Sequence, residues 1–120
     1  MAAGDFSDSD KYAIDKAIRA AEQSSRFEFS VFVGQAHGDP REFAQRLHAS
    51  AVAPARSVLA MVDPVARVVE VVTGEMVRRT LSDAQVELAI VQMQSAFAEG
   101  DLVGGLTRGI AHLAEHARAA

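Results

Sequence analysis

Hydrophobic and polar positions follow different periods along the chain, and the densest apolar pattern lies between residues 57 and 74. Ser57–Val62 and Arg67–Gly74 are two runs rich in Val, Leu and Met, joined by the short segment Asp63–Ala66. Runs of this length around an Asp-Pro turn signal are typical of adjacent β-strands. Both alternating sets of the first run are apolar, which predicts a strand covered on both faces. Glu70 interrupts the second run and favours a position near the sheet edge.

The segments before this pair predict a helix, a strand and a second helix. Residues 10–24 carry apolar side chains at helical spacing, and Phe27–Val33 alternates before it becomes apolar on both sides. Asp39 followed by Pro40 signals a helix start, and this helix must end before Pro54. A helix between two strands predicts a β-α-β unit with a right-handed crossover.

The last third of the chain predicts two helices. Residues 75–80 fit a helical turn, and Ser82 with Gln85 forms a capping-box pattern at the start of the first helix. Its apolar stripe contains Val86, Ala89, Ile90, Met93 and Phe97. The final helix follows Asp101, and its predicted buried side contains Leu102, Leu106, Ile110, Leu113 and Ala117. These stripes predict packing against the sheet.

Together the elements predict one small soluble domain of the α/β class. We expect a three-layer α/β/α sandwich with a small mixed sheet, in which a βαβ unit is followed by a β-hairpin and two C-terminal helices. Residues 1–7 are small and polar and predict a flexible N-terminus, and residues 8–118 form the predicted domain. Gly104, Gly105 and Gly109 lie in the final helix at a cost of roughly 1 kcal/mol each relative to Ala, which predicts close approach of another backbone.

Composition excludes several classes of site. The 12 Lys and Arg residues are scattered among 16 acidic residues, and the net charge of −4 argues against a nucleic-acid surface. The absence of Cys excludes disulfides, thiolate metal sites and a Cys nucleophile. No run is long and apolar enough for membrane insertion, and the first residues do not resemble a signal peptide. We therefore expect a cytoplasmic location for the sequence as given, or the cell envelope if the natural protein carries further segments.

Polar residues collect where the first two predicted strands end. His37 and Asp39 follow the first strand, Asp63 follows the second, and Arg67 lies just across the hairpin. Ligands of open α/β sheets favour this edge, so these residues predict a polar site. The alternative is that each has a local task, with His37 in a loop, Asp39 as a helix cap and Asp63 in a turn. We favour this alternative, because none of these tasks needs a ligand.

Two short motifs contain the letters of known metal sites. Asp8-Ser9-Asp10 has a metal-binding D-x-D pattern, but acidic and hydroxyl residues before a helix are normally caps. His112-Leu-Ala-Glu115-His116 has the letters of the H-x-x-E-H metalloprotease signature. That site needs a third ligand, and only four residues follow His116, at a helix end expected to fray. A solvated helix flank is therefore the favoured interpretation.

The order of elements and two local patterns resemble a known family. Leu81-Ser82-Asp83 opens a helix, and the F-x-x-G-D-x-x-x-G-[LI] pattern covers residues 97–106. This combination resembles the TPM domain family, in particular a bacterial branch of unknown function. The resemblance implies an α/β/α sandwich, with acid phosphatase activity in some plant relatives and calcium-type sites in some members. The family's G-x-G is reduced here to Thr73-Gly74-Glu75, and its adjacent Asp-Arg pair is separated into Asp63 and Arg67.

The resemblance implies candidate metal ligands and leaves two functional hypotheses. By position in the motifs, Asp83, Glu75 and Asp101 are the candidate ligands of a hard cation, calcium or magnesium. The first hypothesis is a non-catalytic interaction or assembly module that binds another protein. The alternative is a metal-dependent acid phosphatase that acts on phosphate monoesters. We favour the interaction module, because a phosphatase needs a metal or cationic group beside an activated nucleophile and the sequence contains no convincing set.

Overall fold

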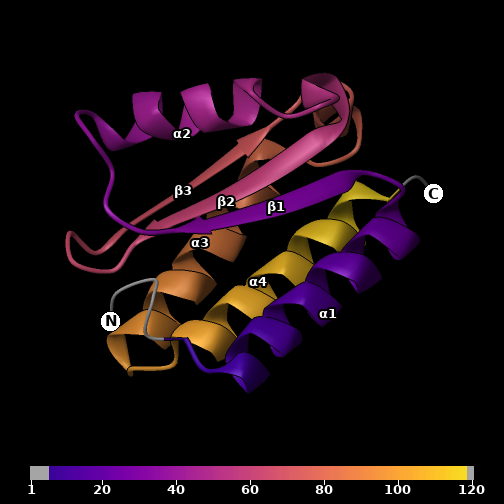
Figure 1. Cartoon of the computed structure of the whole chain (residues 1–120). Coiled ribbons are helices and arrows are strands. Elements are labelled where there is room, and N and C mark those ends of the chain that lie inside the picture. Colours follow the sequence, from indigo (N-terminus) through magenta and orange to yellow (C-terminus); the bar gives the residue numbers. More distant parts are fainter. Residues whose placement is uncertain (1–5, 119–120) are drawn as a thin grey trace.

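A computed structural model describes residues 6–118, which form four α-helices, two short 3₁₀ segments and a three-stranded mixed sheet (Figure 1). The strands are β1 (Glu28–Val33), β2 (Ser57–Asp63) and β3 (Val68–Thr73), and they lie in that order across the sheet. β1 pairs with β2 in parallel, and β2 pairs with β3 in antiparallel orientation. The predicted βαβ unit followed by a hairpin is therefore confirmed.

The helices form a layer on each face of the sheet. α2 (Pro40–Ala49) covers one face, whereas α1 (Asp8–Ser25), α3 (Asp83–Ala98) and α4 (Leu102–Ala117) cover the other (Figure 1). All residues of β2 are buried, because this strand is central and covered on both sides. The α/β/α sandwich predicted from the sequence is confirmed.

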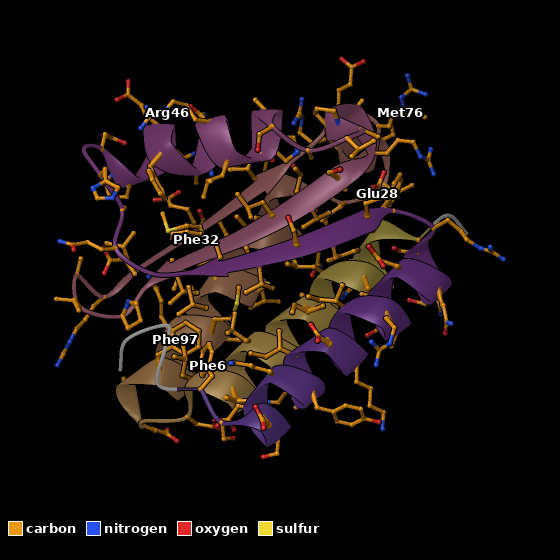
Figure 2. The ribbon with its side chains drawn as sticks, viewed as in Figure 1. Phe6, Glu28, Phe32, Arg46, Met76 and Phe97 are labelled. Atoms are coloured by element: carbon orange, nitrogen blue, oxygen red, sulfur yellow. The ribbon has the colours of Figure 1, made fainter. Side chains whose placement is uncertain are left out.

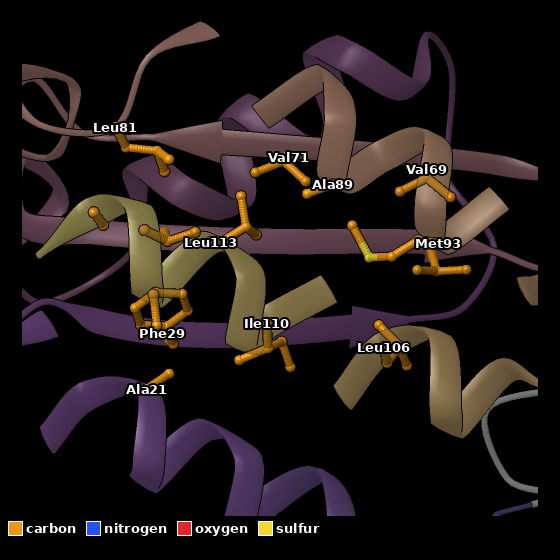
Figure 3. Close-up of a cluster of buried hydrophobic side chains, with 14 of the residues drawn as sticks. Ala21, Phe29, Val69, Val71, Leu81, Ala89, Met93, Leu106, Ile110 and Leu113 are labelled. Carbon is orange, nitrogen blue, oxygen red and sulfur yellow. The ribbon is translucent and has the colours of Figure 1, made fainter. Parts of the chain in front are cut away.

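The larger part of the core lies between the sheet and the layer of α1, α3 and α4. Phe29 and Val71 point from the strands toward Ile110, Leu113 and Ala89 of the helices (Figure 3). The smaller part lies under α2, where the buried residues are Ala44, Leu59, Met61 and Val72. Side chains of β2 alternate between these two clusters, as the strand period of two residues requires.

Two glycines allow α4 to approach α3 closely. A Cβ atom at Gly109 would lie 2.5 Å from Cγ of Met93, and one at Gly105 would lie 2.6 Å from Cε1 of Phe97. Such contacts are far shorter than van der Waals distance, so larger residues would separate the helices. The predicted close packing is confirmed, but the neighbouring atoms belong to side chains of α3 and not to another backbone.

Charged side chains bind backbone groups at both outer edges of the sheet. On the β1 edge, Oε2 of Glu22 accepts a hydrogen bond of 3.1 Å from the backbone N–H of Phe29. On the β3 edge, Nη1 of Arg41 donates to the carbonyl of Val71 at 2.8 Å, and Arg78 donates to the last carbonyl of the strand. A backbone N–H group at the β1 edge is thus bound by an acidic side chain, and two backbone carbonyl groups at the β3 edge are bound by basic side chains.

The ends of several elements differ from the predicted positions. β3 begins at Val68, because Arg67 lies in the preceding turn with a φ angle of 59°. α1 begins two residues early, since Ser7 and Asp10 form a capping box, and Asp8-Ser9-Asp10 is therefore part of a helix start. Of the predicted flexible segment 1–7, residues 1–5 lie outside the described residues, whereas Phe6 packs against the larger core.

No helix within residues 6–118 is long and apolar enough to cross a membrane.

Candidate functional site

Asp63 holds together the loops that leave β1 and β2. Its Oδ2 accepts a hydrogen bond of 3.0 Å from the backbone N–H of Ala36, in the loop after β1. Its Oδ1 accepts bonds from the N–H groups of Val65 and Ala66, at 3.1 and 3.0 Å, in the turn after β2. The residue is only 3% exposed. As predicted, the two loops are neighbours, and a buried carboxylate joins them.

The hydrogen bonds to Asp63 also control its ionisation. The backbone N–H of Ala66, followed by that of Ala36, lowers the pKa of Asp63 below its ordinary value, and burial opposes them with a smaller effect. The carboxylate is therefore ionised at neutral pH, because the donors stabilise its charged form. Since the backbone already uses both oxygens, Asp63 is better suited to fix the loops than to accept a proton from a substrate.

His37 and Asp39 have separate local roles beside this junction. Asp39 caps α2, because its Oδ1 accepts a hydrogen bond of 3.0 Å from the N–H of Glu42. His37 is exposed, and its ring lies edge-on to Phe43 with 5.8 Å between the ring centroids. The structure therefore gives these residues the local tasks that the sequence favoured.

A pocket of about 370 Å³ lies next to Asp63, between the β2–β3 turn and the α3–α4 connection. Most of its walls are apolar, and they come from Val62, Pro64, Val68, Val69, Phe97 and Leu102. The polar side chains in its lining are Asp63, Arg67 and Gln94. Phe97 lies on the face of the sheet that α1, α3 and α4 cover. Phe32 lies on the opposite face, which α2 covers (Figure 2).

The β2–β3 turn contributes a charged and an apolar group beside this pocket. Val65 is 80% exposed, and Arg67 is an exposed lining residue of the pocket in the left-handed conformation. Within residues 6–118 the ion pairs are Arg41 with Glu70 and Arg108 with Asp101, so the guanidinium of Arg67 takes part in neither. The sequence predicted Asp63 and Arg67 here but missed the wall from Phe97 and Gln94, because the α3 stripe indicated only core packing.

The candidate metal ligands do not converge. Asp83 lies in the first turn of α3 and Asp101 caps α4, so the 16 residues of α3 separate them. At a rise of about 1.5 Å per residue, that is a separation of roughly 24 Å. Glu75 is exposed in the connection after β3. Among the described residues, no three His, Asp or Glu side chains form a group that could hold a metal ion.

Asp101 instead has a structural task at the start of α4. Its Oδ1 accepts a hydrogen bond of 2.9 Å from the N–H of Gly104, and its Oδ2 accepts one from Arg108 at 3.3 Å. A Cβ atom at Gly104 would lie 2.2 Å from Oδ2 of Asp101. Gly104 therefore leaves room for the helix cap, and not for the second backbone that the sequence predicted there.

The two histidines of the final helix are half-buried, not on the solvated flank that the sequence favoured. Nε2 of His112 lies 3.0 Å from Oε1 of Gln85 in α3, and the ring centroids of His112 and His116 are 4.5 Å apart. Burial, followed by the charge of His116, lowers the pKa of His112. At the end of this helix, the hydroxyl of Thr80 donates to the carbonyl of Ala117.

Comparison with family models decides the family of this chain. Residues 2–114 match the model described as Domain of unknown function (DUF5130). The chain belongs to the DUF5130 family. The assignment to the TPM domain family is therefore wrong, and the prediction of a domain of unknown function is confirmed. The calcium site and the phosphatase activity, which the TPM resemblance implied, lose that basis.

The DUF5130 domain is similar to curated mycobacterial proteins. It is 29% identical over 105 residues to "Uncharacterized protein MT2543" of Mycobacterium tuberculosis strain CDC 1551 / Oshkosh. The same identity relates it to "Uncharacterized protein Rv2468c" of Mycobacterium tuberculosis strain ATCC 25618 / H37Rv. The alignments cover 88% of this chain, which spans 63% of the length of these relatives.

Three solved structures of bacterial proteins share this fold. The BA42 protein of Bizionia argentinensis has a TM-score of 0.82 at 19% identity, over 93% of this chain and 81% of that one. The N-terminal domain of a protein from P.gingivalis has a TM-score of 0.75 at 20% identity, over 92% and 74%. The N-terminal domain of cg2496 from Corynebacterium glutamicum has a TM-score of 0.76 at 20% identity, over 94% and 74%. At these identities the likeness shows the fold of the DUF5130 domain alone.

Proposed function

We propose that this domain is a non-catalytic protein-interaction module that binds a partner protein at the pocket beside Asp63. An apolar side chain of the partner fills the pocket, and an acidic residue next to it in the partner's sequence contacts Arg67. The observation that carries the proposal is the pocket of about 370 Å³ with mostly apolar walls, next to the exposed Val65 and Arg67. Anchors at protein interfaces typically fill such pockets, and Arg is enriched around them.

The apolar part of the site suits one side chain of a partner. Phe97 of α3 and Leu102 of α4 form one side of the pocket, and Pro64 and Val68 of the β2–β3 hairpin form the other. Since burial of apolar surface contributes roughly 25 cal/mol per Å², a leucine or phenylalanine side chain would gain about 2 kcal/mol here. A contact of this size supports a modest affinity that the surrounding polar groups can increase.

Arg67 supplies the charge that selects the partner. Its guanidinium can form paired hydrogen bonds with a carboxylate, and such charge-assisted bonds are stronger than neutral ones. Asp63 keeps its negative charge while backbone N–H groups use both of its oxygens, so the partner's carboxylate belongs beside Arg67 and away from Asp63. An acidic residue beside the apolar anchor therefore complements the site in charge.

The acid phosphatase alternative has less support from the arrangement of the acidic residues. Asp83 and Asp101 lie at opposite ends of α3, and Asp63 already accepts hydrogen bonds at both oxygens. Hydrolysis of an aryl phosphate tests this alternative directly. We expect background rates with calcium, with magnesium and with chelator, and the same rates in Asp83→Asn. Activity that Asp83→Asn abolishes in a folded protein would overturn the proposal in favour of an enzyme.

A peptide titration followed by NMR tests the interaction site. The probes are two short acetylated peptides that differ in one residue, acetyl-Gly-Leu-Glu-Gly-amide and its Leu-Gln counterpart. We expect the Leu-Glu peptide to shift the amide signals of Val68, Phe97 and Leu102, with at least a fivefold weaker response to the Leu-Gln peptide. Shifts that are absent, or that gather on other elements, would contradict the site.

A pair of arginine variants separates the charge of Arg67 from its effect on the fold. Arg67 and Arg26 are both exposed and have φ angles of 59° and 69°. Asn tolerates the left-handed conformation, so Arg67→Asn removes the charge without disturbing the turn. We expect Arg67→Asn to abolish the preference for the Leu-Glu peptide and Arg26→Asn to retain it. An equal response of the two variants would overturn the role of Arg67.

A further inference from the structure

The last turns of α4 and the first turn of α3 bring together nitrogen and oxygen donors outside the pocket described above. His112 and His116 lie four residues apart on α4, so both rings are on one side of the helix. Gln85 of α3 places its Oε1 3.0 Å from Nε2 of His112. All of these side chains are half-buried, which limits their freedom before any ligand binds.

We propose that His112, His116 and Gln85 form a binding site for a divalent copper or nickel ion. The imidazole nitrogens are the main ligands, and the amide oxygen of Gln85 completes a partial coordination shell with water at the remaining positions. Imidazole suits these metals, and right-angled arrangements of nitrogen and oxygen donors are typical of them. The site requires no acidic ligand.

The separation of the two rings is compatible with both of them binding one ion. Imidazole nitrogen binds a metal at about 2.0–2.1 Å, so each ring centre lies roughly 3.2 Å from the ion. Two such rings at 90° have centres roughly 4.5 Å apart, and at a tetrahedral angle roughly 5.2 Å apart. The observed separation of the centroids is 4.5 Å. This separation is the one expected for two rings at right angles, an arrangement typical of copper and nickel.

The distance between His112 and Gln85 is that of a hydrogen bond, and it also suits two donors that bind one ion side by side. Two donors that each lie about 2.1 Å from an ion are roughly 3.0 Å apart when they bind at 90°. Nε2 of His112 and Oε1 of Gln85 are separated by 3.0 Å. When the imidazole hydrogen is on Nδ1, the lone pair of Nε2 is available to the ion, and the amide oxygen can turn a lone pair toward the same ion.

The position on α4 also favours a cation. His116 lies in the last turn of the helix, where unpaired carbonyl groups give the helix end a partial negative charge. Thr80 donates a hydrogen bond to the carbonyl of Ala117, and Ala117 itself is buried. These contacts anchor the end of the helix next to the two rings.

Calorimetric titration of the untagged full chain with NiCl₂ tests this site, with ZnCl₂ and MgCl₂ as comparison metals. We expect one Ni²⁺ per chain, at least tenfold weaker binding of Zn²⁺ and no binding of Mg²⁺. His112→Gln and His116→Gln should each weaken Ni²⁺ binding at least tenfold, and Gln85→Leu should weaken it severalfold. The chain has four histidines, and the exposed His37 provides the control His37→Gln, which should bind Ni²⁺ as the wild type does.

A spectroscopic measurement makes the test independent of folding defects in the variants. In the wild-type chain, Cu²⁺ should broaden the NMR signals of Gln85, His112 and His116 before those of His37. Broadening that begins at His37, or Ni²⁺ binding that His116→Gln leaves unchanged, would overturn the site. An affinity for Zn²⁺ above that for Ni²⁺ would overturn the right-angled geometry.

Discussion

The α3–α4 helix pair has two ends that differ in chemistry. At the α3–α4 connection, Phe97 and Leu102 meet the β2–β3 turn and form a pocket with mostly apolar walls. At the opposite end, His112 and Gln85 place polar side chains between the same two helices. The contact between the helices at Gly105 and Gly109 lies between these ends and positions both. The comparison indicates that one helix pair positions two chemically different groups of side chains, since the residues at each end, and not the packing, decide the chemistry.

The largest expected effect comes from a change that alters both ends at once. In Gly105→Leu, the new side chain would collide with Phe97 and Ala96, whose atoms lie 2.6 and 2.9 Å from the position of Cβ. Overpacking of this kind costs about 1–3 kcal/mol, and we expect a loss near the upper value in the free energy of unfolding. Urea unfolding measures it. The exposed Ala111→Leu on the same helix is the control, with a change within about 0.5 kcal/mol. Equal stability of the two variants would contradict the tight helix contact.

A smaller effect is expected from Asp63→Ala, which alters the pocket end alone. The substitution leaves the N–H groups of Ala36, Val65 and Ala66 without their acceptor. Hydrogen bonds to charged groups contribute about 1.5–3 kcal/mol, so we expect the free energy of unfolding to fall by about 2 kcal/mol. The affinity for Ni²⁺ should stay at the wild-type value. A change in Ni²⁺ affinity would show that the two ends are coupled.

The pH dependence of stability tests whether the charge of Asp63 stabilises the fold. Its pKa in the fold is lower than the ordinary value of 3.8, so the fold stabilises the carboxylate form. This contribution is present above pH 3.8 and is lost as the pH falls below that value, through the lower pKa of the folded state. We expect the stability difference between wild type and Asp63→Asn to shrink over this range in urea titrations at pH 6 to 2. A constant difference would contradict the charge-dependent role.

The smallest effect on stability is expected at Arg67, which belongs to the surface of the pocket end. A non-glycine residue in the left-handed conformation costs about 1–2 kcal/mol, and Asn tolerates that conformation better than Arg. Arg67→Asn should therefore leave the free energy of unfolding within about 0.5 kcal/mol of wild type, or raise it slightly. Thermal unfolding beside Arg26→Asn measures this. A marked loss in Arg67→Asn alone would show that the guanidinium also stabilises the turn.

The sequence predicted the architecture well, because hydrophobic period and caps depend on local residues. Ser82 caps α3 and Asp39 caps α2, as their patterns predicted, but the side chain of Gln85 contacts His112 and does not complete the predicted capping box. The prediction that Arg67 begins the last strand was wrong, because this residue lies in the turn before β3. Its place there depends on a left-handed backbone conformation that Arg rarely adopts. The 3₁₀ segment Pro54–Arg56 was also missed, since the sequence indicated only that a helix ends before the proline.

The candidate sites were harder to predict than the fold. The loops that carry Asp63 and Ala36 were expected to meet, because consecutive parallel strands place their ends at the same sheet edge. The sequence does not indicate that Phe97 lines a pocket, since the same apolar residue fits a core position equally well. Likewise, the contact of His112 with Gln85 joins residues 27 positions apart and depends on how the two helices pack. The acidic candidates Asp83, Glu75 and Asp101 came from a resemblance that does not hold.

The charged side chains along the outer strands determine how copies of this domain behave when crowded. An uncovered strand edge is a template for another chain, and it can lead to strand exchange or fibrous aggregates. Glu22 occupies a donor on β1, and Arg41 and Arg78 occupy acceptors on β3. A strand of a second copy would have to displace these side chains before it could pair. Tandem or densely clustered copies should therefore remain separate folding units, and a partner should reach the domain through its turns and helices.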